Sequence, residues 1–193
     1  MRGDEKMINF SEVLSDNPVI GAIRNEKDFQ NVINCDVKMV FVLYGNIINI
    51  QEICNELKIN DKIVFVNLDM IEGLRGDKFG IEFIKEKVKP HGIISTNSHV
   101  LKHAKNLGLF TIQRLFILDS VSIETGVSIA KTIKPDAIEI LPGIAYKAVE
   151  LIKNRVSQPL ITGGLIYSQK DAVKALAAGV LGVSTSSRDL WDF

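Results

Sequence analysis

The sequence predicts an α/β fold, a single closed (β/α)8 barrel of the TIM type with short helices and loops. Eight short apolar runs recur along the chain, and their starts lie roughly 20 to 30 residues apart. Each gap has room for one helix. Runs of this kind are typical of parallel strands buried on both faces. The chain has 193 residues, just under the usual lower length of ~200 residues for this barrel, so its helices and loops must be short.

The eight predicted strands are rich in Val, Ile and Leu. In chain order they are residues 19–23, 39–43, 63–68, 92–95, 110–115, 137–141, 160–162 and 181–184. An open doubly wound sheet is the alternative. The closed barrel is favoured because the units are near-equal, no long connection interrupts them, and closure leaves no exposed sheet edge. No linker or low-complexity stretch divides the chain, so we expect one domain over residues 1–193.

Helical periodicity fills the gaps between the strands. The predicted apolar faces are Ile81, Ile84 and Val88; Ile123, Val127 and Ala130; and Val173, Leu176 and Ala177. Ser168 with Asp171 resembles a capping box at a helix start. A short helix over residues 10–14 precedes the first strand, and we expect it to close the bottom of the barrel.

Composition excludes several classes of protein. Lys plus Arg and Asp plus Glu number 23 each, so the net charge is zero. This excludes a basic tail that binds nucleic acid, although not a local basic patch. Cys35 and Cys54 are too few for a disulfide framework. No apolar run reaches the ~18 residues of a membrane span, and the start lacks the apolar core of a secretory signal. We therefore expect a cytoplasmic protein with no membrane partner.

Polar residues follow nearly every predicted strand, at the end of a barrel where binding sites form. The candidate ligand-binding residues are Arg24, Asn46, Asp69, Glu72, Ser95, Arg114, Glu139, Gly163, Gly164, Ser184, Thr185 and Ser186. A buried charge without a partner costs several kcal/mol, so charges on apolar strands are usually paired or bound to a ligand. The alternative is that the arginines and carboxylates only neutralise one another. That alternative does not explain the glycines or the hydroxyl cluster.

The last two strands carry the clearest ligand signal. Gly163 and Gly164 follow the seventh strand, and Ser184, Thr185 and Ser186 end the eighth. Many barrels bind phosphate with these two loops, where glycine lets backbone N–H groups approach the oxygens and hydroxyls add donors. A tight turn with a helix cap is the alternative. Together with the charged residues, the pattern predicts a site for a small phosphorylated sugar or polyol.

Catalytic groups are scarce at the strand ends. No lysine lies inside a strand near its carboxyl end, so a Schiff-base aldolase is disfavoured. No predicted strand ends in histidine or cysteine. We therefore expect no enzyme, no catalytic residues and no cofactor. Asp69 and Glu139 leave open an acid–base pair of the isomerase or epimerase type. The carboxylates could also hold a divalent cation, but no metal-ligand spacing supports one.

Six stretches of the chain resemble the glycerol-3-phosphate-responsive antiterminator family, also called glycerol uptake operon antiterminator regulators. They are residues 66–74, 92–97, 111–116, 135–143, 162–166 and 183–186, and the similarity runs from about residue 19 to residue 191. Asn67 departs from the family, where we expect histidine. The resemblance implies a regulator of glycerol metabolism that senses glycerol 3-phosphate and promotes transcription antitermination by binding the leader RNA of glycerol-utilisation genes. It also implies ligand binding by Asp69, Glu72, Arg114, Glu139, Gly163, Gly164, Ser184 and Ser186.

RNA contact is predicted at the densest basic cluster of the chain. Its lysines are Lys85, Lys87, Lys89, Lys102 and Lys105. Glu82 and Glu86 interleave with them, so an ordinary solvated helix surface is the alternative. No aromatic stacking motif of an RNA-recognition domain is present. Recruitment of a partner protein, with an indirect effect on RNA, is a further hypothesis, and the sequence leaves the oligomeric state open, a homodimer included.

Overall fold

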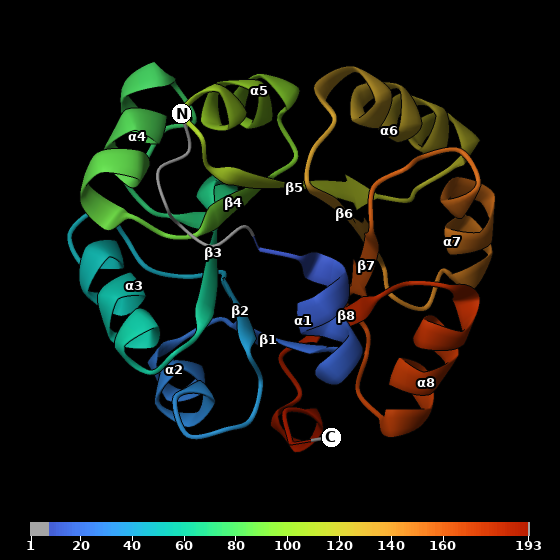
Figure 1. Ribbon diagram of the computed structural model, residues 1–193, viewed down its shortest axis with the longest axis horizontal. Helices are drawn as coiled ribbons and strands as arrows, with labels where there is room; N and C mark the ends of the chain where they lie inside the picture. Colours follow the sequence, from blue (N-terminus) through green and yellow to red (C-terminus); the bar gives the residue numbers. More distant parts are fainter. Residues whose placement is uncertain (1–7, 193) are drawn as a thin grey trace.

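The computed structural model describes residues 8–192, which form a closed parallel barrel of eight strands (Figure 1). The strands are β1 Val19–Ile23, β2 Met39–Val42, β3 Ile63–Asn67, β4 Gly92–Ser95, β5 Phe110–Phe116, β6 Ala137–Leu141, β7 Leu160–Gly163 and β8 Gly182–Thr185. Each strand pairs with the next along the chain, and β8 pairs with β1. The closed (β/α)8 barrel is therefore confirmed, and the open sheet is wrong.

Helices surround the barrel and connect successive strands. They are α1 Phe10–Asp16, α2 Glu26–Val32, α3 Ile50–Ile59, α4 Lys78–Phe83, α5 Ser98–Asn106, α6 Ser120–Ile133, α7 Tyr146–Lys153 and α8 Gln169–Ala178. A π-helical turn, η2 (Ile84–Val88), continues α4, and η1 (Leu68–Met70) and η3 (Arg188–Leu190) are single 3-10 turns. The capping box of Ser168 and Asp171 is present at the start of α8. Because the strands are parallel, all their carboxyl ends meet at one rim.

Two apolar layers stabilise the barrel. The outer layer lies between the strands and the surrounding helices. The inner layer fills the barrel itself and consists of Phe10, Leu14, Ile20, Met39, Phe41, Phe65, Ile94, Ile112, Ala137 and Ile161. Burial of this apolar surface is the main favourable contribution to folding. Strands covered on both sides explain the continuous apolar runs of the sequence.

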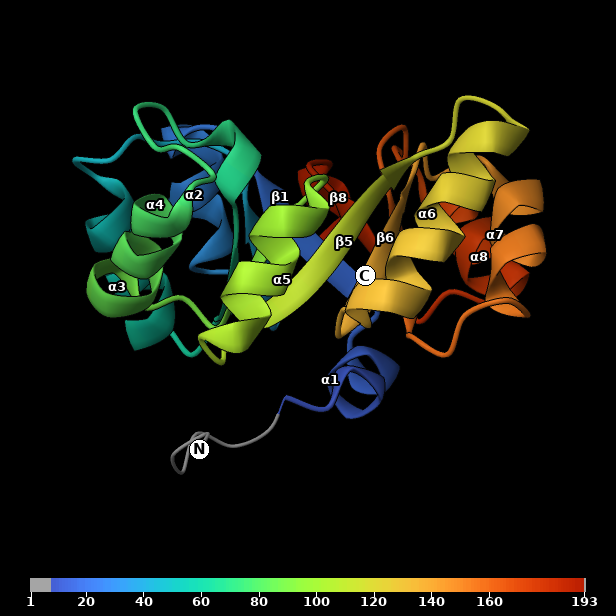
Figure 2. The ribbon, with the colours of Figure 1, turned by 90° about the horizontal axis from the view of Figure 1, so that it is seen from above.

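Helix α1 closes the amino-terminal end of the barrel, as the sequence predicts (Figure 2). The Phe10 ring centroid lies 5.6 Å from that of Phe65 and 6.5 Å from that of Phe110. Leu14 is fully buried against Gly182, where an added Cβ would lie 3.1 Å from a Leu14 methyl carbon. The rim at the carboxyl ends of the strands lies on the opposite side.

The predicted apolar faces are confirmed for α4–η2 and for α6. That of α8 is wrong for Val173 and Ala177, which are exposed, whereas Leu176 packs partly against the core. The buried side chains of α8 are Ala172, Ala175 and Ala178, whereas Val173 is 53% exposed. Both sets of residues have helical spacing, so the pattern alone does not separate them. Small alanine side chains let a helix lie closer to the layer beneath it, and this close approach decides the buried face.

We predict that Leu14→Ala lowers the free energy of unfolding by about 2–5 kcal/mol, because it leaves a cavity under the barrel. Urea denaturation followed by circular dichroism measures the change. Ser11→Ala is the control, since Ser11 is exposed on the same helix and surface substitutions usually stay within about 0.5 kcal/mol. Equal midpoints for the two variants would show that α1 does not stabilise the barrel.

Candidate functional site

A cavity of about 300 Å³ opens at the rim where the strands end. It lies among the ends of β1, β2 and β5 to β8 and the loops that follow them. The predicted site residues that line it are Arg24, Arg114, Glu139, Gly164, Ser184, Thr185 and Ser186. Gly163 adjoins them, packed against Ser184 and Glu139. The structure thus brings together most of the candidates from strands β1, β5, β6, β7 and β8.

Glu139 is the centre of a buried network at the base of the cavity. The Arg114 Nε donates to Glu139 Oε2 over 2.7 Å, and the Ser184 hydroxyl donates to Glu139 Oε1 over 2.6 Å. All three side chains are buried. Strand register explains the first contact, since Arg114 and Glu139 are direct neighbours on β5 and β6. Charge-assisted hydrogen bonds to both carboxylate oxygens offset the cost of removing these charges from water.

Gly163 is a glycine because this network fills the space that a side chain would need. A Cβ at this position would lie 2.1 Å from Ser184 Oγ and 2.9 Å from Glu139 Oε1. Gly164 has φ +76°, a left-handed conformation that favours glycine, and its carbonyl accepts from the Gly143 N–H over 2.8 Å. The two glycines therefore shape the cavity wall, whatever ligand it takes.

Thr185 joins the two loops that border the cavity after β7 and β8. Its hydroxyl donates to the Ile166 carbonyl over 2.7 Å and accepts from the Ser187 N–H over 3.0 Å. The Trp191 indole donates to the Thr185 carbonyl over 2.9 Å. Because these bonds use the Thr185 hydroxyl, the neighbouring Ser186 has the freer hydroxyl group at the cavity.

Arg24 presents a cation at the edge of the cavity. Its guanidinium makes no ion pair or side-chain hydrogen bond within residues 8–192, and the residue is exposed. Asp28, four residues further along the chain, accepts from the Arg24 backbone N–H over 3.0 Å and pairs with Arg188 over 2.8 Å. Mutual neutralisation therefore accounts for Arg114 and Glu139 but not for Arg24.

Asp69 and Ser95 do not line the cavity. Ser95 Oγ donates to Asp69 Oδ1 over 2.7 Å. The Thr96 N–H and hydroxyl donate to Asp69 Oδ2 over 2.8 and 3.0 Å. Asp69 thus ties η1 to the start of α5, and both of its oxygens are engaged. Met70, its neighbour on η1, does reach the cavity.

Asn46 and Glu72 also lie outside the cavity. The Asn46 side-chain oxygen accepts from the N–H groups of Ile48 and Asn49 over 2.9 and 3.2 Å, which shapes the loop after β2. Glu72 is exposed and pairs with this loop through its backbone. Short polar side chains at strand ends commonly satisfy nearby backbone groups in this way, and the sequence pattern does not distinguish that role from ligand binding.

The remaining cavity wall is largely apolar and was not predicted. It consists of Ala22, Leu43, Met70, Phe116, Leu141, Leu165, Ile166 and Tyr167. Three of these residues lie in the strands themselves, Leu43 directly follows β2, and the others lie two to four residues beyond a strand. Apolar residues are common at such positions, so the sequence pattern does not mark them as part of a site.

The predicted basic cluster is spread over two helical faces. Lys87, Lys89 and Lys102 are exposed, and Lys85 is half-buried. Lys105 is engaged with the end of α6, where its ammonium donates to the Lys134 carbonyl. The Lys105 ammonium thus satisfies a carbonyl left over at the carboxyl terminus of α6.

The described part of the chain has neither a cluster of metal ligands nor a helix suited to a membrane. Over residues 8–192, no three His, Cys, Asp or Glu side chains are grouped so that they could hold a metal ion. No helix in the same range combines the length and apolar character that crossing a membrane needs.

The fold and cavity define a (β/α)8 barrel with a cavity of mixed polar and apolar lining at the carboxyl ends of its strands, a class that includes both enzymes and binding proteins. The chain belongs to the glycerol-3-phosphate responsive antiterminator family, whose model matches residues 19–191. The resemblance seen in the sequence is confirmed.

Individual relatives agree with this assignment. The uncharacterized protein YgcP of Escherichia coli is 38% identical over 179 residues, 93% of this chain and 94% of its own length. The crystal structure of a glycerol uptake operon antiterminator regulatory protein from Listeria monocytogenes has a TM-score of 0.88 at 30% identity, covering 92% of this chain and 96% of that one. An antiterminator-related protein from Thermotoga maritima has a TM-score of 0.81 at 31% identity, covering 91% and 98%. A putative deoxyribose-phosphate aldolase is also similar at 11% identity, which shows the fold alone.

We predict that Gly163→Ala destabilises the protein by about 1–3 kcal/mol, because the new methyl group meets the Ser184 hydroxyl. The double variant Gly163→Ala, Ser184→Ala removes the Ser184 hydroxyl, so its loss of stability should be smaller than the sum of the losses in the two single variants. Denaturant midpoints of the two variants and of Ser184→Ala alone give the comparison. Additive losses, with no recovery in the double variant, would contradict the packing described for Gly163.

Proposed function

We propose that this protein binds glycerol 3-phosphate in the cavity at the strand ends and promotes transcription antitermination of glycerol-utilisation genes by binding leader RNA. The observation that carries the proposal is that the Arg24 guanidinium has no acidic partner within residues 8–192. It lies at the edge of a cavity bordered by the loops after β7 and β8. These are the loops with which many barrels hold phosphate. Family membership gives the proposal its biological setting.

The cavity can be divided by chemistry into two parts. Arg24, Gly164 and Ser186 stand at the outer wall, where a cation, a left-handed glycine turn and a hydroxyl suit a phosphate group. Arg114, Glu139 and Ser184 form the base, where donors and acceptors suit the hydroxyl groups of a polyol. The volume of about 300 Å³ is at the small end of ligand pockets, which suits a short phosphorylated polyol.

The bonding of the carboxylates supports a sensor over an isomerase or epimerase. Both oxygens of Glu139 accept hydrogen bonds from protein groups, and so do both oxygens of Asp69. Asp69 also lies outside the cavity lining. A general base must reach the proton that it removes, and this pair is not arranged to do so. None of the eight strands contains a lysine, so the strands supply no amine for a Schiff base.

We predict that isothermal titration detects glycerol 3-phosphate binding and that Arg24→Ala weakens it about 10- to 100-fold, the scale of a lost hydrogen bond to a charged group. Lys131→Ala is the matched control, since it removes the same charge from an exposed position on α6 and should leave the affinity unchanged. Absence of heat and of a thermal shift at millimolar ligand would overturn the proposed binding site.

We predict that filter binding retains the leader transcript of glycerol-utilisation genes from the same genome and that glycerol 3-phosphate changes the amount retained. The reason is that a ligand shifts a binding equilibrium only if it has different affinities for the two states, and linkage makes that effect reciprocal. Retention that ligand does not change would contradict a ligand-responsive RNA binder. No retention at all would favour the recruitment of a partner protein.

A further inference from the structure

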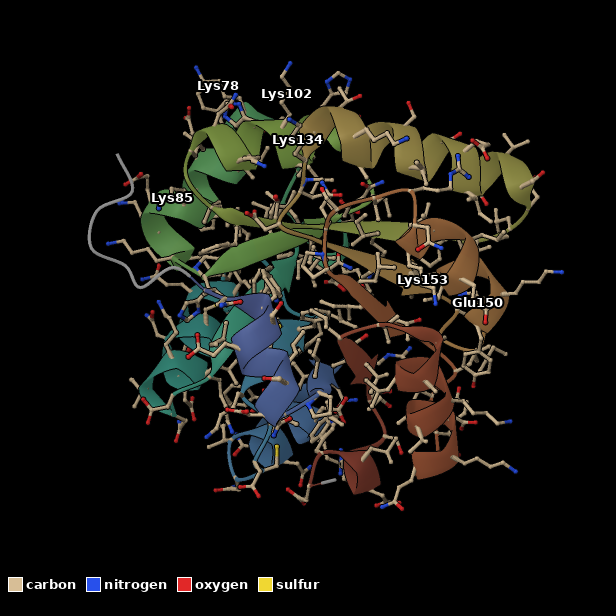
Figure 3. The ribbon with its side chains drawn as sticks, turned by 45° about the vertical axis from the view of Figure 1, so that its right-hand side comes forward. Lys78, Lys85, Lys102, Lys134, Glu150 and Lys153 are labelled. Carbon is tan, nitrogen blue, oxygen red and sulfur yellow. The ribbon has the colours of Figure 1, made fainter. Side chains whose placement is uncertain are left out.

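A groove of about 400 Å³ lies on the outside of the barrel between α4 and α5. Its lining residues are Gly76, Asp77, Lys78, Ile81, His99, Lys102, His103 and Asn106. Lys78 and Lys102 project from these neighbouring helices at the same edge of the molecule (Figure 3). Asp77 is the one acid of the lining, and its Oδ1 accepts from the Gly80 N–H as a helix cap. Lys78 also faces Glu82 over 3.9 Å, a loose and exposed pair.

His103 leaves an unsatisfied polar atom at this groove. Its Nε2 is buried and has no hydrogen-bond partner among the described residues. Buried polar atoms in folded proteins are almost always hydrogen-bonded, so this ring nitrogen is an exception in the lining of the groove. With Lys78 and Lys102 beside it, the groove favours a ligand with negative charge and hydrogen-bonding groups.

Phe79 adds an aromatic surface beside the groove. It follows Lys78 on α4 and is 75% exposed, and the Lys78 ammonium lies 5.9 Å from its ring centroid. An exposed aromatic ring next to a cationic groove is the combination with which proteins bind single-stranded nucleic acid. The cations follow the phosphates, and the ring stacks with a base.

The groove is also joined to the ligand cavity by a short chain of contacts. Met70 lines the cavity, and Asp69 beside it holds Ser95 and Thr96 at the start of α5. His99 and Lys102 lie on the first turns of that helix. A shift of η1 on ligand binding would thus act directly on one wall of the groove.

We propose that the groove between α4 and α5, with Phe79 at its side, is the surface that contacts single-stranded RNA. The inference rests on the RNA binding proposed above, and it moves the contact from the lysines of η2 to the groove between α4 and α5. Lys102 is shared by both surfaces, whereas Lys87 belongs only to the earlier one.

Fluorescence anisotropy with the labelled leader transcript tests the proposal on the full chain. Lys102→Glu and Phe79→Ala should each weaken RNA binding about tenfold or more, the scale of a lost phosphate contact or a lost stacked base. Lys87→Glu is the matched control and should change it less than about twofold. Glycerol 3-phosphate affinity, measured by titration, should stay at the wild-type value in all three, which shows that the variants are folded.

The outcomes separate the inference from the proposed function. RNA affinities of Lys102→Glu and Phe79→Ala equal to wild type would overturn the groove while leaving RNA binding in place. An equal loss in Lys87→Glu and Lys102→Glu would also overturn it, because it would indicate attraction to the whole basic face. A wild-type protein that binds no leader transcript would overturn the proposed function and the groove together.

Discussion

The rim at the carboxyl ends of the strands is organised around one buried carboxylate. Glu139 accepts from Arg114 on one side and from Ser184 on the other, and so joins β5, β6 and β8 across the mouth. Removing Arg114 would leave the buried Glu139 carboxylate without a compensating charge, which is a strongly destabilising change. The position of Gly163, the shape of the cavity floor and the orientation of Arg114 all follow from this interaction.

Strand positions were predictable because each strand is covered on both faces. Burial on both sides requires a continuous apolar run, and such runs stand out between polar helices, so every strand began within one residue of its expected start. The buried face of α8 was not predictable in the same way. Val173 and Ala172 both have helical spacing, and the choice depends on how close the helix lies to its neighbours, which is a tertiary property.

The sequence predicts which strand ends contribute to the candidate site, but it does not predict which of their side chains pair with one another. Arg24 and Arg114 look alike in the sequence, because each lies near the carboxyl end of a predicted apolar strand. Only the register of β5 and β6 shows that Arg114 has a carboxylate beside it. Only the structure of the loop after β1 shows that Arg24 has no such partner within residues 8–192. Asp69 was expected in the cavity but lies outside it for a related reason. The groups that engage its carboxylate come from the next strand and its loop.

The two arginines differ in what their charges contribute to this rim. A fixed ion pair at the base of a cavity offers preorganised donors and acceptors. A cation at its edge that has no acidic partner in the described chain gains favourable electrostatic energy when an anion binds. Catalysis would need, in addition, a group free to take a proton or form a bond. Glu139 and Asp69 each have both oxygens committed to protein donors. The same bonds that hold this rim together therefore fix the orientation of its carboxylates.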